Sequence, residues 1–298
     1  ALADQSAFPL TQLKPINAVL DDAPLWAPAL YKLLNWASRY YQYPLGDALA
    51  TVMPGSLRKG KPAHRERERV WQLTEAGKDQ PITALTRAPK QARILTMLRS
   101  GAMAHSDLLD SDLTAAVIKT AEEKGWINIV QNVRAKPWMP NYRVVEDKPT
   151  PNHEQALAVA TINASPEFGC YLIEGVTGSG KTEVYLNALE PVLARGQQAL
   201  ILVPEIGLTP QTINRFKRRF NVPVEVMHSG LNDTERLNAW LAARDNEAAI
   251  IIGTRSALFA PFKSLGIIIV DEEHDASYKQ QDSFRYHARD LAVMRGHE

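Results

Sequence analysis

Two segments of the chain combine residue types and spacing that suit nucleotide chemistry. The first matches the complete phosphate-loop pattern G-x-x-x-x-G-K-[ST]. The second is an acidic run that directly follows the apolar stretch Ile267–Val270. Together they predict a site that binds a nucleoside triphosphate and activates water against it. The phosphate loop is Gly175, Val176, Thr177, Gly178, Ser179, Gly180, Lys181 and Thr182, and the acidic run is Asp271, Glu272, Glu273 and His274.

The phosphate loop predicts how the triphosphate is held. Its glycines let backbone N–H groups turn toward the phosphates, and the helix expected to begin near Lys181 adds the positive end of its dipole. We expect Lys181 to bridge the β- and γ-phosphates and the Thr182 hydroxyl to coordinate Mg²⁺. ATP and Mg²⁺ are therefore the expected cofactors.

The acidic run supplies the other half of the expected chemistry. Asp271 is expected to end a buried strand and to hold Mg²⁺ through water, while Glu272 is the candidate general base. His274 has two interpretations, a sensor of the γ-phosphate and a plain structural histidine. The separation of Lys181 and Asp271 leaves room for the strand–helix repeats of a nucleotide-binding sheet.

From about residue 150 the sequence alternates short apolar runs with helical stretches. Such runs, apolar on both faces and joined by helices, predict an α/β fold whose parallel sheet is covered by helices on both faces. Ligands bind such sheets at the carboxyl ends of the strands, where both motifs fall. The expected strands are Tyr171–Ile173, Leu200–Val203, Val224–Met227, Ala249–Ile252 and Ile267–Val270, and the expected helices are 183–194, 210–220 and 233–244.

Two more strand ends offer contacts for the phosphates of a nucleic-acid backbone. Residues 203–211 lead from a strand into a helix with Thr209 as N-cap, which exposes helix N–H groups beside Gln211. The next strand end carries Thr254 and Arg255. Structurally neutral helix caps look similar, so that alternative stays open. The basic helix face, interpreted as a solvated surface, consists of Arg215, Lys217, Arg218 and Arg219.

The first 62 residues mix apolar and aromatic side chains and end in a basic stretch. Residues 25–37 place apolar side chains at helical spacing. The tyrosines that follow, Tyr40, Tyr41 and Tyr43, fit core packing, with stacking on bases as the alternative. The basic residues between 55 and 69 indicate a solvated linker, and contact with phosphates is the other interpretation.

Residues 63–149 predict a small domain and a proline-rich connector. Three short helices followed by a strand are typical of a winged helix, a module that serves either DNA contact or protein packing. The expected elements are helices over 89–98, from Ser106, and from Ser111 or Asp112 to Lys124, and a strand over 126–130.

Composition limits the classes of protein that the chain fits. Its 298 residues are 45% hydrophobic, enough for a sizeable core and for two or three domains. With 34 Lys and Arg against 33 Asp and Glu, the net charge is +1, so nucleic-acid binding has to come from local patches. The single cysteine, Cys170, excludes an internal disulfide and a multi-cysteine metal site, and it fits a reducing cytosol. No apolar run reaches the roughly 18 residues of a membrane helix, so no membrane is expected as a partner.

Together these motifs resemble the first motor lobe of superfamily 2 helicases of the DExH type, and within them the PriA family of replication-restart helicases. The resemblance is specific over 150–298 and looser over 1–149. It implies a RecA-like helicase lobe over 150–298, a winged-helix-like domain and connector over 63–149, and the end of a 3′-end-binding DNA domain with a basic linker over 1–62. The residues that carry it are the two motifs above, Val203 to Gln211, His228 to Asp233, Gly253 to Phe259, Ser277 to Gln281 and Arg285 to Asp290.

The resemblance also implies roles for individual residues. Gln155 matches a glutamine that reads adenine, and the stretch from Tyr278 to Arg289 looks like an aromatic-rich loop that stacks on single-stranded DNA. The residues expected to couple DNA contact to ATP hydrolysis are His274, Tyr278, Phe284, Arg285 and Tyr286.

At the level of the whole protein, the resemblance implies an ATP-dependent 3′→5′ DNA helicase of the replication-restart primosome. Its expected partners are forked, branched or single-stranded DNA, other primosome proteins and single-stranded-DNA-binding protein. Its expected place is the bacterial cytoplasm, at the nucleoid. The rival interpretations are another superfamily 2 motor of the RecG type, a DNA-binding module without turnover and, disfavoured by Thr209, Thr254 and the acidic run, a metabolic kinase.

The chain also departs from the family pattern. The second RecA-like lobe, with the arginines that complete the ATP site, and the cysteine-rich zinc module are not in this sequence, so zinc is expected only outside this chain. Because the chain begins with Ala1 and stops at Glu298 in mid-pattern, we expect a fragment. Such a fragment should bind ATP and DNA weakly and turn over poorly.

Overall fold

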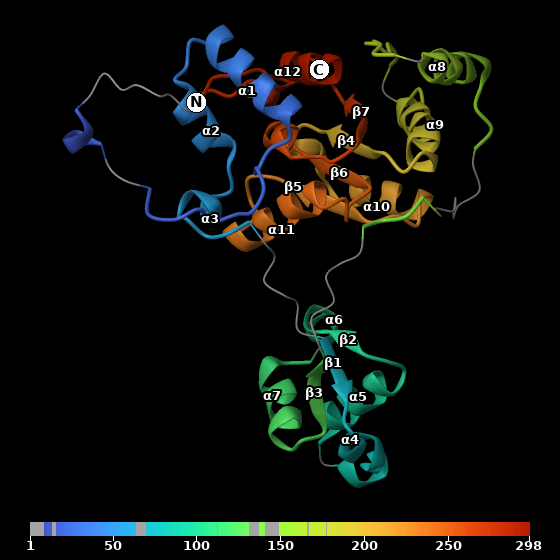
Figure 1. The fold of residues 1–298 in the computed structure, drawn as a ribbon. Helices are drawn as coiled ribbons and strands as arrows, with labels where there is room; N and C mark the ends of the chain where they lie inside the picture. Colours follow the sequence, from blue (N-terminus) through green and yellow to red (C-terminus); the bar gives the residue numbers. More distant parts are fainter. Residues whose placement is uncertain are drawn as a thin grey trace. The chain divides into compact units, whose positions relative to one another are not determined.

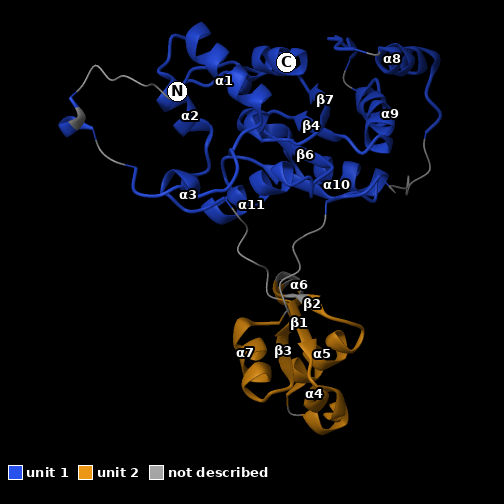
Figure 2. Cartoon of the chain, viewed as in Figure 1, with its two compact units in different colours: residues 1–64, 137–298 blue, residues 65–136 orange. Residues whose placement is uncertain are grey.

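The computed structural model (Figure 1) divides the chain into two compact units, coloured separately in Figure 2. One unit comprises residues 1–64 and 137–298, and the other comprises residues 65–136. The first unit is therefore discontinuous in sequence, and it contains both nucleotide motifs. The described residues are 9–13, 16–63, 70–86, 88–111, 113–130, 137–140, 149–165, 167–176 and 178–298.

A four-stranded sheet forms the centre of the first unit. Its order is β5-β6-β4-β7, and every neighbouring pair is parallel. The strands are rich in Ile, Leu, Val and Ala, which suits a parallel sheet buried on both faces. The α/β fold with a parallel sheet is thus confirmed. The strands are β4 (Gln198–Leu202), β5 (Val224–Met227), β6 (Ile250–Gly253) and β7 (Leu265–Val270).

Alternation along the strands divides the apolar side chains between two cores. Leu200 and Leu202 of β4 join one core, whereas Ala199 and Ile201 of the same strand join the other. The first core is completed by α11 (Asp233–Arg244) and α12 (Ala288–His297), which bury Trp240 and Leu291. The second core is completed by α9 (Lys181–Ala194) and α10 (Pro210–Arg219). Helices therefore cover both faces of the sheet.

Side-chain caps fix where three helices of this unit begin. Asn152 and Gln155 form a reciprocal capping box at the start of α8 (His153–Ala164). Asn232 and Glu235 form another at α11. Thr209 caps α10 with its hydroxyl, as expected from the sequence, and Pro210 takes the first helical position. The expected helices over 183–194, 210–220 and 233–244 are confirmed; α8 and α12 were not expected.

One expected strand is wrong in this structure. Residues 171–173 form no strand, and Tyr171 and Leu172 are 42% and 76% exposed. Within the described part of the chain, β7 pairs with β4 alone. The expectation rested on a run of three apolar residues, and so short a run does not specify pairing to a sheet by itself.

The N-terminal segment packs into the first unit instead of standing apart from it. Its helix α1 (Pro28–Tyr40) buries Leu30, Leu33 and Leu34 in the same core as Trp240, and it lies beside α12 (Figure 1). Burial requires apolar positions three and four residues apart, which is the spacing predicted for residues 25–37. The segment also contains η1 (Leu10–Gln12), α2 (Leu45–Val52) and α3 (Gly55–Arg58).

The start of the expected linker is part of this packing as well. Gly55, Ser56 and Leu57 are buried, so the interpretation of residues 55–69 as a solvated linker is wrong for these three residues. Burial of α3 beside α11 is the reason. The basic side chains that follow, Arg58, Lys59 and Lys61, are exposed, and residues 64–69 lie outside the described part.

The second unit is a three-stranded antiparallel sheet packed against short helices. The sheet order is β2-β1-β3, and Trp71, Ile94 and Ile127 share its core. The winged-helix expectation matches this arrangement. The elements are β1 (Val70–Leu73), α4 (Glu75–Asp79), η2 (Ile82–Leu85), α5 (Pro89–Arg99), β2 (Met103–Ala104), α6 (His105–Asp110), α7 (Ala115–Glu123) and β3 (Ile127–Val130).

The expected helices of this unit are present with two shifted starts: α6 begins at His105, before the expected cap at Ser106, and the start of α7 is later than expected. The helix over 89–98 is confirmed by α5, but α7 begins at Ala115, after Thr114 and not at Ser111. Asp112 and the side chain of Ser106 lie outside the described part. Gly125 ends α7 with a φ of 68°, a conformation that glycine adopts without strain. Strand β1 was not expected, because four residues give too short an alternation.

Candidate nucleotide-binding site

The phosphate loop leads directly into α9 and leaves the start of that helix open. Gly180 is its N-cap with a φ of 85°, and no side chain caps the helix. Gly178 has a φ of 83°, so both glycines adopt the left-handed conformation that lets backbone N–H groups turn inward. An uncapped helix N-terminus offers its N–H groups to an anion such as a phosphate. Thr177 lies outside the described part.

Lys181 lies over the loop that it follows. Its ammonium donates to the carbonyl of Gly175 at 2.7 Å and reaches the carbonyl of Val176 at 3.5 Å. The Lys181 ammonium therefore lies against the phosphate loop, next to the uncapped N-terminus of α9. This donor set fits a triphosphate, because the ammonium can exchange two carbonyls for phosphate oxygens.

Gln155 contacts the same loop from α8. Its amide nitrogen donates to the carbonyl of Ser179 at 2.9 Å, while its amide oxygen accepts from the N–H of Asn152 at 3.0 Å. A Cβ at Gly180 would come within 2.4 Å of that amide nitrogen, so glycine is needed for the close approach. The capping box thus orients Gln155 toward the phosphate loop, and its adenine-reading role stays an implication of the resemblance.

Asp271 follows β7 and reaches the first turns of α9. Its carboxylate accepts from the Tyr185 hydroxyl at 3.2 Å, and its carbonyl accepts from the Tyr278 hydroxyl at 2.6 Å. Burial raises the pKa of the Asp271 carboxyl above its ordinary value, while Tyr185 and the charge of Lys181 lower it. Because Tyr185 belongs to the helix that Lys181 begins, its hydrogen bond ties the Asp271 carboxylate to that helix.

Glu272 has an unusual backbone. Its φ is 45°, in the left-handed region that residues other than glycine rarely adopt, and its side chain is 46% exposed. Such strain is concentrated at functional sites. The His274 imidazole lies 3.7 Å from the Glu272 carboxylate, and Glu273 pairs with Arg289 at 2.9 Å. Glu272 is therefore the acidic side chain directed to solvent beside Asp271.

The oxygen donors at this edge fit Mg²⁺, which favours a few carboxylate and hydroxyl ligands with water. Thr182 stands in the first turn of α9, and Asp271 is tied to the same helix through Tyr185. Among the described residues, no three His, Cys, Asp or Glu side chains gather into a metal cluster. Thr182 and Asp271 are thus the candidate ligands.

The expected DNA contacts separate into exposed and buried residues. Gln211 is exposed in the first turn of α10, and the Thr209 hydroxyl accepts from the N–H of Thr212 at 3.2 Å. Thr254 is only 4% exposed, so the expectation that it contacts DNA is wrong for this structure. Its backbone N–H bonds the Met227 carbonyl at the end of β5, which draws the residue into the sheet.

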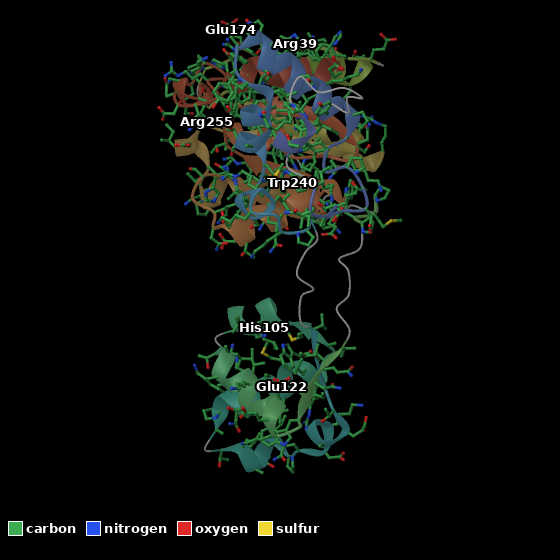
Figure 3. All side chains as sticks on the ribbon, turned by 60° about the vertical axis from the view of Figure 1, so that its left-hand side comes forward. Arg39, His105, Glu122, Glu174, Trp240 and Arg255 are labelled. Carbon is green, nitrogen blue, oxygen red and sulfur yellow. The ribbon has the colours of Figure 1, made fainter. Side chains whose placement is uncertain are left out.

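Arg255, at the start of η4 (Arg255–Phe259) and labelled in Figure 3, ties neighbouring loops together. Its guanidinium donates to the Gln280 side chain at 2.7 Å and to the Ser277 carbonyl at 2.9 Å. It also lies 3.6 Å from the Glu205 carboxylate. The guanidinium therefore connects the loop after β4 with the loop after β7, and these bonds compete with any contact to a DNA phosphate.

The aromatic-rich loop faces the core instead of solvent. Phe284 and Tyr286 are 0% and 3% exposed, so the expectation that they stack on DNA is wrong for this structure. Phe284 stacks on Tyr43 with ring centres 5.3 Å apart, and it meets Tyr41 edge-on at 6.0 Å. The Tyr41 hydroxyl accepts from the N–H of His287 at 3.1 Å. The N-terminal segment covers the rings, which explains their burial; Arg285 remains exposed.

Three residues of the site escaped the sequence reasoning. Tyr185 holds Asp271, Arg215 donates to the Thr182 hydroxyl at 3.2 Å, and Arg219 pairs with Glu183. The interpretation of the basic helix face as solvated is therefore wrong for Arg219, which is 3% exposed. The only sequence signal was the spacing of Arg215 and Arg219, four residues apart on one helix face.

Three family models match the chain in the order in which its parts occur. Residues 1–54 match the 3′ DNA-binding domain, residues 69–129 match the primosomal protein N′-like winged helix, and residues 150–297 match the DEAD/DEAH box helicase. Among the described residues, no helix is long and apolar enough to cross a membrane.

The chain is also similar to curated proteins named replication restart protein PriA. It is 46% identical to the Haemophilus influenzae protein over 97% of this chain and 40% of the relative. It is 38% identical to the Chlamydia pneumoniae protein over 96% and 40%, and 44% identical to the Bacillus subtilis protein over 62% and 24%. The chain thus spans at most about two fifths of these relatives. It belongs to the PriA family of replication restart proteins, with a DEAD/DEAH box helicase domain behind a winged helix and a 3′ DNA-binding domain.

Proposed function

We propose that this chain is the nucleotide-binding lobe of an ATP-dependent DNA helicase that moves 3′→5′ on forked or branched DNA during replication restart. One observation carries the proposal: Tyr185 of α9 holds Asp271 at the end of β7, which brings the carboxylate beside the helix that starts with Lys181 and Thr182. This contact supports a site in which phosphate donors, a metal ligand and a candidate base share one edge of the sheet, as nucleotide hydrolysis requires.

In this proposal each side chain has one task. Lys181 releases the Gly175 carbonyl to bind the β- and γ-phosphates, and Gln155 holds the loop while it reads adenine. Mg²⁺, bound by Thr182 and Asp271, would neutralise charge that develops on the phosphates. Glu272 accepts the proton of the attacking water, a task that its exposed carboxylate suits. His274, 3.7 Å from Glu272, would report whether that site is filled.

DNA, other primosome proteins and single-stranded-DNA-binding protein are the proposed partners. The exposed Gln211 and the first turn of α10 are the proposed contact with the DNA backbone. The loop from Tyr278 to Tyr286 would transmit this contact to Asp271 through the Tyr278 hydroxyl, not by stacking on DNA. Because the arginines of a second lobe are needed to complete such a site, this chain alone would turn over slowly.

The proposal is tested by Lys181→Ala in the full-length protein, with Lys217→Ala, an exposed lysine of α10, as the matched control. Loss of the ammonium should abolish DNA-stimulated ATP hydrolysis, measured by phosphate release, while binding of a labelled fork survives. Lys217→Ala should retain its ATPase activity. Unchanged turnover in Lys181→Ala would exclude the assigned site, and loss of fork binding alone would assign the residue to DNA contact.

A further inference from the structure

Two arginines of α10 contact side chains in the first turn of α9. Arg215 donates to the Thr182 hydroxyl at 3.2 Å, and Arg219 forms an ion pair with Glu183. The two arginines are four residues apart and therefore lie on the same face of α10. Both partners belong to the first turn of α9, next to Lys181. A face of α10 is thus directed at the expected metal and phosphate site.

The Arg219–Glu183 pair fixes the position of α10. The Arg219 side chain is 3% exposed and that of Glu183 is 29% exposed, so the pair is largely shielded from water. A guanidinium that is shielded from water is costly to separate from its carboxylate, and Phe216 buries the adjacent turn of α10 in the core. Arg215 therefore extends from a helix that cannot shift freely, and its contact with Thr182 follows from that placement.

The Thr182 oxygen cannot serve Arg215 and a metal ion equally well. A hydroxyl oxygen has two lone pairs, and the guanidinium donates to one of them in this structure. A divalent cation on the same oxygen would stand a few ångströms from a guanidinium that never loses its charge. The two positive charges repel each other, so the Arg215 contact and metal binding oppose one another.

We propose that Arg215 and Mg²⁺ compete for the Thr182 hydroxyl, so that Arg215 has to leave this oxygen before Mg²⁺ binds there. The inference rests on the proposed function, because it takes Thr182 as a ligand of Mg²⁺. Arg215 is a positioning residue: it sets how much Mg²⁺ the site needs without touching the nucleotide. Since the side chain is exposed, its release costs little burial.

The test measures binding instead of turnover. A fluorescent ATP analogue is titrated into the full-length protein at a series of Mg²⁺ concentrations and in EDTA. For Arg215→Ala, the Mg²⁺ concentration at half-maximal binding should fall about two- to fivefold, the range of a partly exposed charge interaction. Binding in EDTA should change less than about twofold. Arg218→Ala, at an exposed arginine of the same helix, should match the wild type.

A second variant separates charge from shape. Arg215→Lys keeps the positive charge, so its Mg²⁺ requirement should stay near that of the wild type, whereas the neutral Arg215→Gln should resemble Arg215→Ala. An unchanged Mg²⁺ requirement in both neutral variants would overturn the proposal, and a raised requirement would show that Arg215 assists the metal. If the wild-type protein bound the analogue without any dependence on Mg²⁺, the proposed function itself would fail, which is a distinct result.

Discussion

Phe284 decides between two roles for the aromatic-rich loop, and its replacement by alanine gives a large predicted effect. The ring is fully buried and lies within 6.5 Å of Tyr41, Tyr43, Phe259 and Tyr286, measured between ring centres. Truncation of a buried phenylalanine costs about 3–5 kcal/mol. Since a domain has about 5–15 kcal/mol in total, Phe284→Ala should remove a large part of the stability of the first unit.

The assay is urea unfolding followed by circular dichroism, with two companion variants. Arg285→Ala changes the exposed neighbour and should alter the free energy of unfolding by about 0.5 kcal/mol at most. Phe284→Leu keeps most of the apolar bulk but loses the ring contacts, so it should cost clearly less than Phe284→Ala. Because Phe284→Leu removes the aromatic ring but retains most of the packing, it should also keep the stimulation of ATP hydrolysis by DNA.

The outcome that would refute this reasoning is equally specific. A ring that stacks on DNA makes Phe284→Ala nearly neutral for stability and makes both Phe284 variants lose DNA stimulation. A double-mutant cycle with Tyr43→Ala adds a direct measure of the stacked pair. Aromatic pairs are worth about 0.5–1.5 kcal/mol beyond their area, so the coupling energy should lie in that range. A coupling near zero would mean that the N-terminal segment does not hold the loop in solution.

Two further predictions concern buried polar groups. Gln198→Ala removes a buried amide that donates to two backbone carbonyls and accepts from two backbone N–H groups, so the free energy of unfolding in urea should fall by about 3 kcal/mol or more. Gln281→Ala, at an exposed glutamine, is its control. Burial raises the pKa of Asp271 in the folded protein above its ordinary value, so the protonated carboxyl favours folding. This contribution to the free energy of unfolding is fully present below the ordinary pKa. It is lost as the pH rises through the raised pKa. Asp271→Asn should therefore melt at a higher temperature than the wild type at pH 7 without nucleotide, and the difference should vanish in acid; a lower melting temperature at pH 7 would contradict the sign.

The elements around the candidate site that the sequence predicted correctly depend on local rules. The helix after the phosphate loop, the strand that leads to Asp271 and the cap at Thr209 each need only a few consecutive residues. Buried parallel strands show continuous apolar runs, which is why the expected strands at β4, β5, β6 and β7 agree with the structure within a residue or two. Local patterns therefore located the two motifs and the sheet between them.

The errors about which side chains are exposed share one cause, which is a partner far away in the sequence. Burial of Phe284 depends on Tyr41 and Tyr43, which precede it by more than two hundred residues. Thr254 is buried because its backbone joins β5, and Arg219 because it meets Glu183 on another helix. The local sequence around an aromatic or hydroxyl residue after a strand is the same whether a distant segment buries that residue or leaves it exposed to bind a ligand. Tertiary packing, not propensity, made that choice.

The N-terminal segment has the largest consequence of this kind. A DNA-binding family model matches residues 1–54, yet Leu30, Leu33 and Leu34 of α1 lie in the same core as β4 and β6 of the helicase unit. This segment, which the family model matches to a DNA-binding domain, therefore packs as part of the first unit. Through Tyr41 and Tyr43 it also contacts the loop whose Tyr278 hydroxyl bonds Asp271. A movement of this segment would therefore disturb the loop that holds the Asp271 carbonyl.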